Sequence, residues 1–129
     1  MDGILEKFMR DAAQNPERPM YDFMDCGSEL YVHHYITIGE AWQHAMDMAA
    51  ELRQKGARPG DRAIILSMQD AGTVYAIWGC MIAGVIFTVI PPPIDEGKLE
   101  ENLRILHQVE ERTGAKILLA QKCFSCFSY

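Results

Sequence analysis

The chain has 129 residues, of which 49% are hydrophobic, so the sequence predicts at most one domain with enough apolar material for a core. Twelve basic and eighteen acidic side chains give a formal net charge of −6. Because the acidic groups are spread along the chain and a nucleic-acid binder carries a basic face, this balance argues against nucleic-acid binding.

The start of the chain bears on its compartment. Residues 1–7 are charged and contain no apolar core segment, so no signal peptide is expected. The four cysteines, Cys26, Cys80, Cys123 and Cys126, are then expected to be reduced thiols, because disulfides are rare in proteins that are not secreted. We therefore expect a cytoplasmic location.

The amino-terminal segment predicts a helix followed by a hairpin. Apolar residues fall at helical spacing over residues 4–15, and Asn15-Pro16 ends the helix. Residues 20–25 and 30–36 each alternate in polarity, and Cys26-Gly27-Ser28 between them supplies a turn. This pattern is typical of an antiparallel β-hairpin.

The four histidines are the first candidates for metal ligands. His33 and His34 are adjacent on the second predicted strand, so they point to opposite faces and cannot both bind one ion. No Cys, His or Asp partner stands at ligand spacing, so we expect partly exposed strand histidines. His44 and His107 lie on the polar sides of predicted helices and are expected at the surface.

A second helix begins at Thr37-Ile38-Gly39-Glu40, a capping-box sequence. Its apolar stripe has residues spaced by three and four: Ile38, Ala41, Trp42, Ala45, Ala49 and Leu52. Gly56 is expected to end the helix, and Pro59-Gly60-Asp61 to turn the chain. The continuous apolar run that follows, residues 63–68, is typical of a strand covered on both faces.

No charged residue lies between Asp70 and Asp95, and two structures could accommodate such a segment. Residues 73–90 approach the roughly 20 apolar residues that a membrane-spanning helix needs. However, β-branched and aromatic residues follow Gly84, three prolines follow Ile90, and no basic residue closely flanks either end. We therefore predict no membrane span: a buried helix capped at its start by Asp70 covers residues 73–83, the chain turns at Gly84, and a strand covers residues 85–90.

A further helix over residues 98–112, capped by Asp95 and ended by Gly114, is predicted from an inner stripe of Leu99, Leu103, Leu106 and Val109. Residues 116–120 then form a third strand. The fold class is therefore α/β: an amino-terminal helix and β-hairpin followed by an open parallel β-α-β-α-β sheet, an incomplete half of a larger domain.

The last residues depart from this order. Cys123-Phe124-Ser125-Cys126 could form a redox pair or half a zinc site, but a thioredoxin-like context and two further zinc ligands are missing. We interpret residues 123–129 as an irregular tail produced by a truncated or frame-shifted form of a longer gene.

Three segments together resemble the beginning of an adenylate-forming enzyme. They are Thr37-Ile38-Gly39-Glu40-Ala41, then residues 49–62 (AAELRQKGARPGDR), then residues 78–85 (WGCMIAGV). The resemblance covers about residues 37–120, and we assign residues 1–122 to the amino-terminal part of an adenylate-forming (AMP-binding) domain. The superfamily includes acyl-CoA synthetases, fatty acyl-AMP ligases and adenylation domains of peptide synthetases, and Val89-Ile90-Pro91-Pro92-Pro93 looks most like the fatty acyl-AMP ligase branch or a loading module.

The resemblance implies an enzyme that joins a carboxylic acid to ATP, with Mg²⁺, and passes the acyl group to CoA or a carrier protein. Phosphate binding there needs a Ser/Thr/Gly-rich loop followed by Pro-Lys-Gly, which this sequence lacks. We therefore assign no catalytic, cofactor-binding or metal residue. Gly56, Gly60 and Gly84 are expected in turns and caps, and Trp42 and Trp78 in the core.

Three functions remain open from the residues, of which a membrane-attached small protein ranks third. The first two are an amino-terminal portion of an acid-activating ligase, inactive alone, and a stand-alone module that docks on a polyketide or peptide synthase partner. In the first case, a sheet that stops at its third strand leaves an unpaired edge, through which copies could associate.

Overall fold

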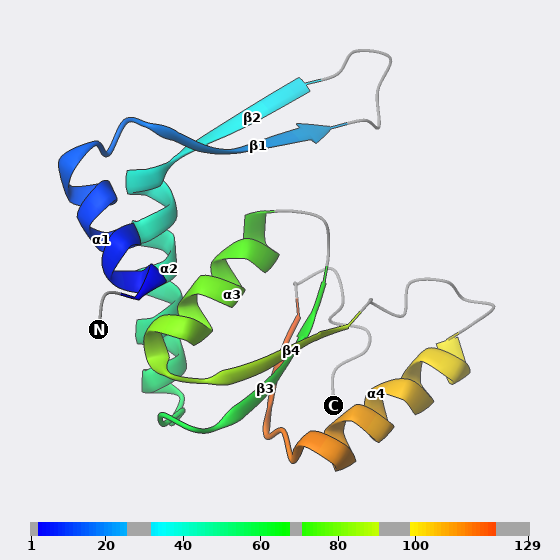
Figure 1. Cartoon of the computed structure of the whole chain (residues 1–129). Helices are drawn as coiled ribbons and strands as arrows, with labels where there is room; N and C mark the ends of the chain where they lie inside the picture. Colours follow the sequence, from blue (N-terminus) through cyan, green and yellow to red (C-terminus); the bar gives the residue numbers. More distant parts are fainter. Residues whose placement is uncertain (1–2, 26–31, 68–70, 91–98, 121–129) are drawn as a thin grey trace.

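The computed structural model describes residues 3–25, 32–67, 71–90 and 99–120 (Figure 1). The helices are α1 (Ile4–Gln14), α2 (Ile38–Gln54), α3 (Ala71–Ala83) and α4 (Leu99–Thr113). The strands are β1 (Pro19–Asp25), β2 (Val32–Thr37), β3 (Arg62–Leu66), β4 (Ile86–Ile90) and β5 (Ile117–Leu119). The predicted α/β fold class is confirmed.

Two separate sheets are present in the described part of the chain. Strands β1 and β2 form the antiparallel hairpin, and the parallel sheet has the order β4-β3-β5. Strand β3 lies in the centre: Ala63 is paired with Phe87 of β4 and with Ile117 of β5. The four residues 63–66 are all buried, as expected for a strand covered on both faces.

The parallel sheet is the middle of three layers. Ala63 and Ile65 belong to a core cluster with residues of α2 and α3, whereas Ile64 and Leu66 pack with Leu106 of α4. Figure 1 shows α3 and α4 on opposite sides of the strands. Successive side chains of β3 therefore point to opposite faces of the sheet, so one strand contributes to two different cores.

The long uncharged segment is a helix, a turn and a strand. Helix α3 ends at Ala83, and Gly84 has φ +76°, a left-handed conformation that favours glycine. The Val85 amide then donates to the Cys80 carbonyl at 2.8 Å, and β4 begins one residue later. All residues of α3 are buried or half-buried, as the sequence predicted. Within the described ranges no helix is both long and apolar enough to cross a membrane.

The start of α2 follows the predicted capping box. The Glu40 amide donates to Thr37 Oγ1 at 3.2 Å, which satisfies one of the free amides of the first turn. Five of the six predicted stripe residues are buried, and the sixth, Trp42, is half-buried. Gly56 follows the helix with φ +96°, as expected for its end.

The amino-terminal part packs on α2 and α3 through aromatic contacts. Phe8 of α1 makes edge contacts with Trp42, at a centroid distance of 5.0 Å, and with Trp78 of α3, at 4.6 Å. Trp78 Nε1 also donates to the Tyr21 hydroxyl at 2.8 Å, which links α3 to the hairpin. Both tryptophans are half-buried, so they line the junction of the two parts rather than the centre of the sheet core.

Some predictions lie outside the described residues: the hairpin turn at residues 26–28, the caps at Asp70 and Asp95, and the tail at residues 123–129. The other elements agree with their predicted spans to within a few residues at each end. In α4, Leu106 is buried, and Leu103 and Val109 pack beside it, as the inner stripe predicted.

Candidate functional site

The chain reverses its direction of winding at β3. It runs from β3 through α3 to β4 on one side, and then through α4 to β5 on the other side of β3. In open α/β sheets, ligands bind in the crevice beside the carboxyl ends of the strands at such a switch point. A ligand site is therefore expected beside the carboxyl ends of β3 and β5.

A cavity of about 620 Å³ lies there, within the 300–1,000 Å³ range of ligand pockets. We call it the switch-point pocket. It is lined by residues of two helices and two strands: Met48, Glu51, Leu52 and Lys55 of α2, Gly72, Thr73 and Ala76 of α3, Ile65 and Leu66 of β3, and Leu118, Leu119 and Ala120 of and after β5.

The interior and the mouth of the switch-point pocket differ in chemistry. Leu52, Ile65 and Ala76 are buried in its wall, so the interior is mainly apolar. Glu51 and Lys55 are the charged side chains among its described lining residues, and both are exposed. Lys55 Nζ lies 3.3 Å from Glu51 Oε1. Such an exposed pair is worth little and leaves the ammonium accessible to a third group.

The close approach of α2 and α3 shapes this pocket. A Cβ at Gly79 of α3 would lie 2.7 Å from Met48 Cβ and 3.3 Å from the Ala45 carbonyl oxygen. A side chain at this position would clash with α2, so glycine allows α3 and α2 to pack closely. Met48 is thereby held at the contact and forms part of the pocket wall.

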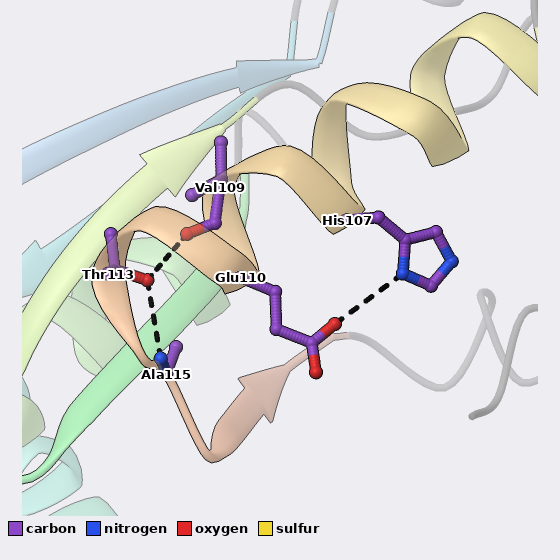
Figure 2. Close-up of polar contacts among 5 residues, drawn as sticks. All are labelled: His107, Val109, Glu110, Thr113 and Ala115. Atoms are coloured by element: carbon purple, nitrogen blue, oxygen red, sulfur yellow. Dashed lines mark hydrogen bonds and ion pairs between the residues drawn. The ribbon is translucent and has the colours of Figure 1, made fainter.

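Strand β5 forms another wall of the switch-point pocket, and hydrogen bonds at the end of α4 fix its position. Figure 2 shows the last turn of α4, where Thr113 Oγ1 donates to the Val109 carbonyl at 2.7 Å and accepts from the Ala115 amide at 3.3 Å. The Arg62 guanidinium donates to the Thr113 carbonyl, and the Lys116 amide donates to the Arg62 carbonyl at 3.1 Å. These bonds set the register of β5 beside β3. In the part of the chain that the structure describes, β5 has no strand on its outer side.

The structure adds partners to the histidines that the sequence placed at the surface. His33 and His34 are exposed on β2, and His33 Nδ1 lies 2.8 Å from Asp22 Oδ2 of β1. Sequence spacing missed this partner because it comes from the opposite strand of the hairpin. His44 is exposed and stacks on Tyr75 of α3, with ring centroids 4.5 Å apart.

His107 is also exposed, and its Nδ1 lies 3.6 Å from Glu110 Oε2 on the same helix (Figure 2). None of these histidines lines the switch-point pocket. Within the described ranges, no three His, Cys, Asp or Glu side chains are grouped so that they could share a metal ion.

Cys80 is the cysteine that the structure describes, and it is a free thiol at 0% exposure. Burial raises its pKa to about 11, because the thiolate is disfavoured away from water. A thiol in this environment is a packing group rather than a nucleophile. Cys26, Cys123 and Cys126 lie outside the described residues.

The glycines singled out in the sequence have structural positions. Gly60 and Gly84 both have positive φ, and the Gly60 amide donates to the Gly84 carbonyl at 2.8 Å, so the two turns support each other. The prediction that no residue of this chain is catalytic stays a prediction.

The model of the AMP-binding enzyme family matches residues 8–123. The chain belongs to this family. The match extends the resemblance seen in the sequence to α1 and the hairpin.

Two solved members of similar structure are informative. A fatty acyl-adenylate ligase from Legionella pneumophila, solved with acyl adenylate and pyrophosphate, is 26% identical with a TM-score of 0.77. The alignment covers 94% of this chain and 20% of that one. O-succinylbenzoate coenzyme A synthetase (MenE) from Bacillus subtilis is 25% identical with a TM-score of 0.66, covering 92% of this chain and 27% of that one.

Among curated proteins, pyochelin synthetase PchE of Pseudomonas aeruginosa is 28% identical over 98 residues, 76% of this chain. A carboxynorspermidine/carboxyspermidine decarboxylase of Herminiimonas arsenicoxydans matches at 54% identity over only 35 residues, 27% of this chain. The aligned part of this chain spans 6% of PchE and 10% of the decarboxylase.

Proposed function

We propose that the chain is the amino-terminal portion of an acid-activating ligase, which forms an acyl-adenylate from a carboxylic acid and ATP. The observation that carries the proposal is the AMP-binding family match over residues 8–123. The parallel sheet with helices on both faces supports it, because the similar ligase solved with acyl adenylate and pyrophosphate has the same arrangement over 94% of this chain.

We propose fatty acids as the substrate class and CoA or a carrier protein as the acceptor of the whole enzyme, with Mg²⁺ and ATP as its cofactors. The fatty acyl-adenylate ligase has a higher TM-score than MenE, which favours a fatty acid over an aromatic acid. A cytoplasmic location is proposed with it, because CoA and ATP are available there.

We propose that these 129 residues are inactive by themselves. A triphosphate needs several cationic groups or backbone amides, and the switch-point pocket offers Lys55 as its one cation among the described lining residues. The purified chain is expected to give no decanoate-dependent exchange of labelled pyrophosphate into ATP. The Legionella pneumophila ligase is the positive control, and exchange above the acid-free background would contradict inactivity.

The ligase assignment has its own test. Translating the gene beyond codon 122 in all three frames should give a Thr/Ser/Gly-rich loop ending in Pro-Lys-Gly. The whole product should then support acid-dependent exchange. A gene without that loop in any frame would contradict the assignment.

The second candidate is an interaction module that docks on a synthase partner. The match to PchE, a synthetase much longer than this chain, favours it. The open side of β5 separates the two candidates, because an incomplete domain exposes an edge that a finished module would protect.

For the incomplete domain we expect the sedimentation coefficient to rise with protein concentration. Ala120→Lys, which places a charge at the end of β5, should reduce that rise, whereas Ala50→Lys on the exposed side of α2 should not. A monodisperse monomer that melts cooperatively would favour the interaction module instead.

A further inference from the structure

We propose that Met48 of α2 is an oxidation site. A hydroperoxide that enters the switch-point pocket converts the Met48 thioether to the sulfoxide, and the sulfoxide forces α2 and α3 apart. The proposal concerns the packing of these two helices. It requires no catalysis by the chain and does not depend on the ligase assignment.

The switch-point pocket gives an oxidant access to Met48. This residue is half-buried and lines the pocket, whose mouth carries the exposed side chains of Glu51 and Lys55. Hydrogen peroxide is only slightly larger than water, so a cavity of about 620 Å³ that opens to solvent admits it. Met48 is therefore open to attack while the chain is folded.

The Met48 side chain has no spare room on the side of α3. A Cβ at Gly79 would lie 2.7 Å from Met48 Cβ, so Met48 fills the space that the glycine leaves. Sulfoxidation adds an oxygen to the sulfur and turns an apolar group into a polar one. The core cluster on which Met48 packs contains Ile65 and Ala76, whose side chains offer that oxygen no hydrogen-bond donor. The sulfoxide must therefore move towards water, and the contact between α2 and α3 loosens.

Other methionines of the chain provide the contrast. Met9 of α1 is 51% exposed and Met46 of α2 is 39% exposed. Both should react faster than Met48, because oxidation follows exposure, but their sulfoxides remain in water and leave the packing unchanged. Met20 and Met81 are half-buried, and neither is among the described residues that line the pocket. An oxidation that alters the fold is therefore assigned to Met48.

The reaction transfers one oxygen atom and two electrons. The sulfur lone pair of Met48 attacks one peroxide oxygen, the O–O bond breaks as the S–O bond forms, and proton transfer releases the other oxygen as water. The thioether is oxidised and the peroxide is reduced. Methionine sulfoxide reductases reverse the step with a dithiol, which becomes a disulfide while the oxygen leaves as water.

The test treats the folded chain with hydrogen peroxide and follows each methionine by tandem mass spectrometry. We expect Met48 to be oxidised several times more slowly than Met9, at a rate that urea below the unfolding transition does not change. The urea midpoint of the oxidised protein should then fall by about 1 M, the loss expected for an unsatisfied polar group in the core. Dithiothreitol added before unfolding reduces oxidised cysteines and leaves methionine sulfoxide in place.

Met48→Leu conserves volume and removes the sulfur, so peroxide should leave its midpoint unchanged. Met46→Leu is the matched control on the exposed side of the same helix and should lose as much as wild type. Reduction of the Met48 sulfoxide by the two reductases should restore the wild-type midpoint. Four results would each overturn the proposal: an unmodified Met48 after complete oxidation of Met9, an oxidation rate that rises with urea, equal losses in wild type and Met48→Leu, or a midpoint that stays low once Met48 is reduced.

Discussion

Replacing Gly79 with leucine is expected to destabilise the fold by about 3 kcal/mol, the upper end of the usual cost of overpacking. Helices α2 and α3 meet at this glycine, where even one added carbon would lie 2.7 Å from Met48 Cβ and 3.3 Å from the Ala45 carbonyl oxygen. The Met48 side chain can move, but the Ala45 backbone belongs to a helix whose inner face is buried. The helices must therefore separate, which opens the core beside Ile65.

Urea denaturation followed by circular dichroism measures this cost. Ala50→Leu is the control for leucine on a helix, because Ala50 is exposed on α2, and it should change the free energy of unfolding by less than about 0.5 kcal/mol. Gly79→Ala should lie between the two, and adding Met48→Ala to it should restore part of the loss. A Gly79→Leu protein as stable as wild type would mean that α2 and α3 are not packed this closely.

Phe8→Ala is expected to cost about 3–5 kcal/mol, the range for removing a buried aromatic side chain. Phe8 is 4% exposed and contacts Trp42 of α2 and Trp78 of α3 edge-on, so one ring joins three helices. Edge-to-face contacts between aromatic rings add to the stabilisation that burial of the Phe8 ring provides. Losing the ring leaves a cavity where α1, α2 and α3 meet.

The two tryptophans report on this junction. In Phe8→Ala their fluorescence should shift to longer wavelength as water enters, and the urea midpoint should fall. Met9→Ala is the control on the same helix, because Met9 is 51% exposed, and it should change neither quantity measurably. If Phe8→Ala shifts the fluorescence but leaves the urea midpoint for unfolding of the parallel sheet unchanged, α1 unfolds separately from that sheet.

Most elements could be predicted because their signals are local. The Thr37 N-cap, the stripe of α2 and the glycine at position 84 each act within a few residues, and the structure contains all three features. The choice between a spanning helix and a helix-turn-strand was also local. Gly84 permits a positive φ, and the β-branched residues after it favour an extended chain.

The candidate site could not be predicted in this way. The switch-point pocket takes residues from α2, α3, β3 and β5. Glu51, Leu52 and Lys55 belong to the family-resembling segment 49–62, but that segment does not indicate which other elements pack beside it. The Asp22–His33 pair and the Trp78–Tyr21 hydrogen bond were missed for the same reason. Their partners come from different strands or from elements far apart in the chain.

The sequence by itself determined, to within a few residues, where helices and strands begin and end, that the helical part of the uncharged segment is buried, and which family the chain resembles. The strand part is only partly buried, because Ile86 and Val89 of β4 are exposed. Only the tertiary structure decided that β3 lies between β4 and β5, that Phe8 joins three helices, and that a pocket opens where the winding reverses. The physical reason is that propensity, capping and turn conformation depend on neighbouring residues, whereas strand order and cavities depend on contacts between distant ones. Those contacts form when apolar surfaces pack, and residue spacing along the chain does not encode which surfaces meet.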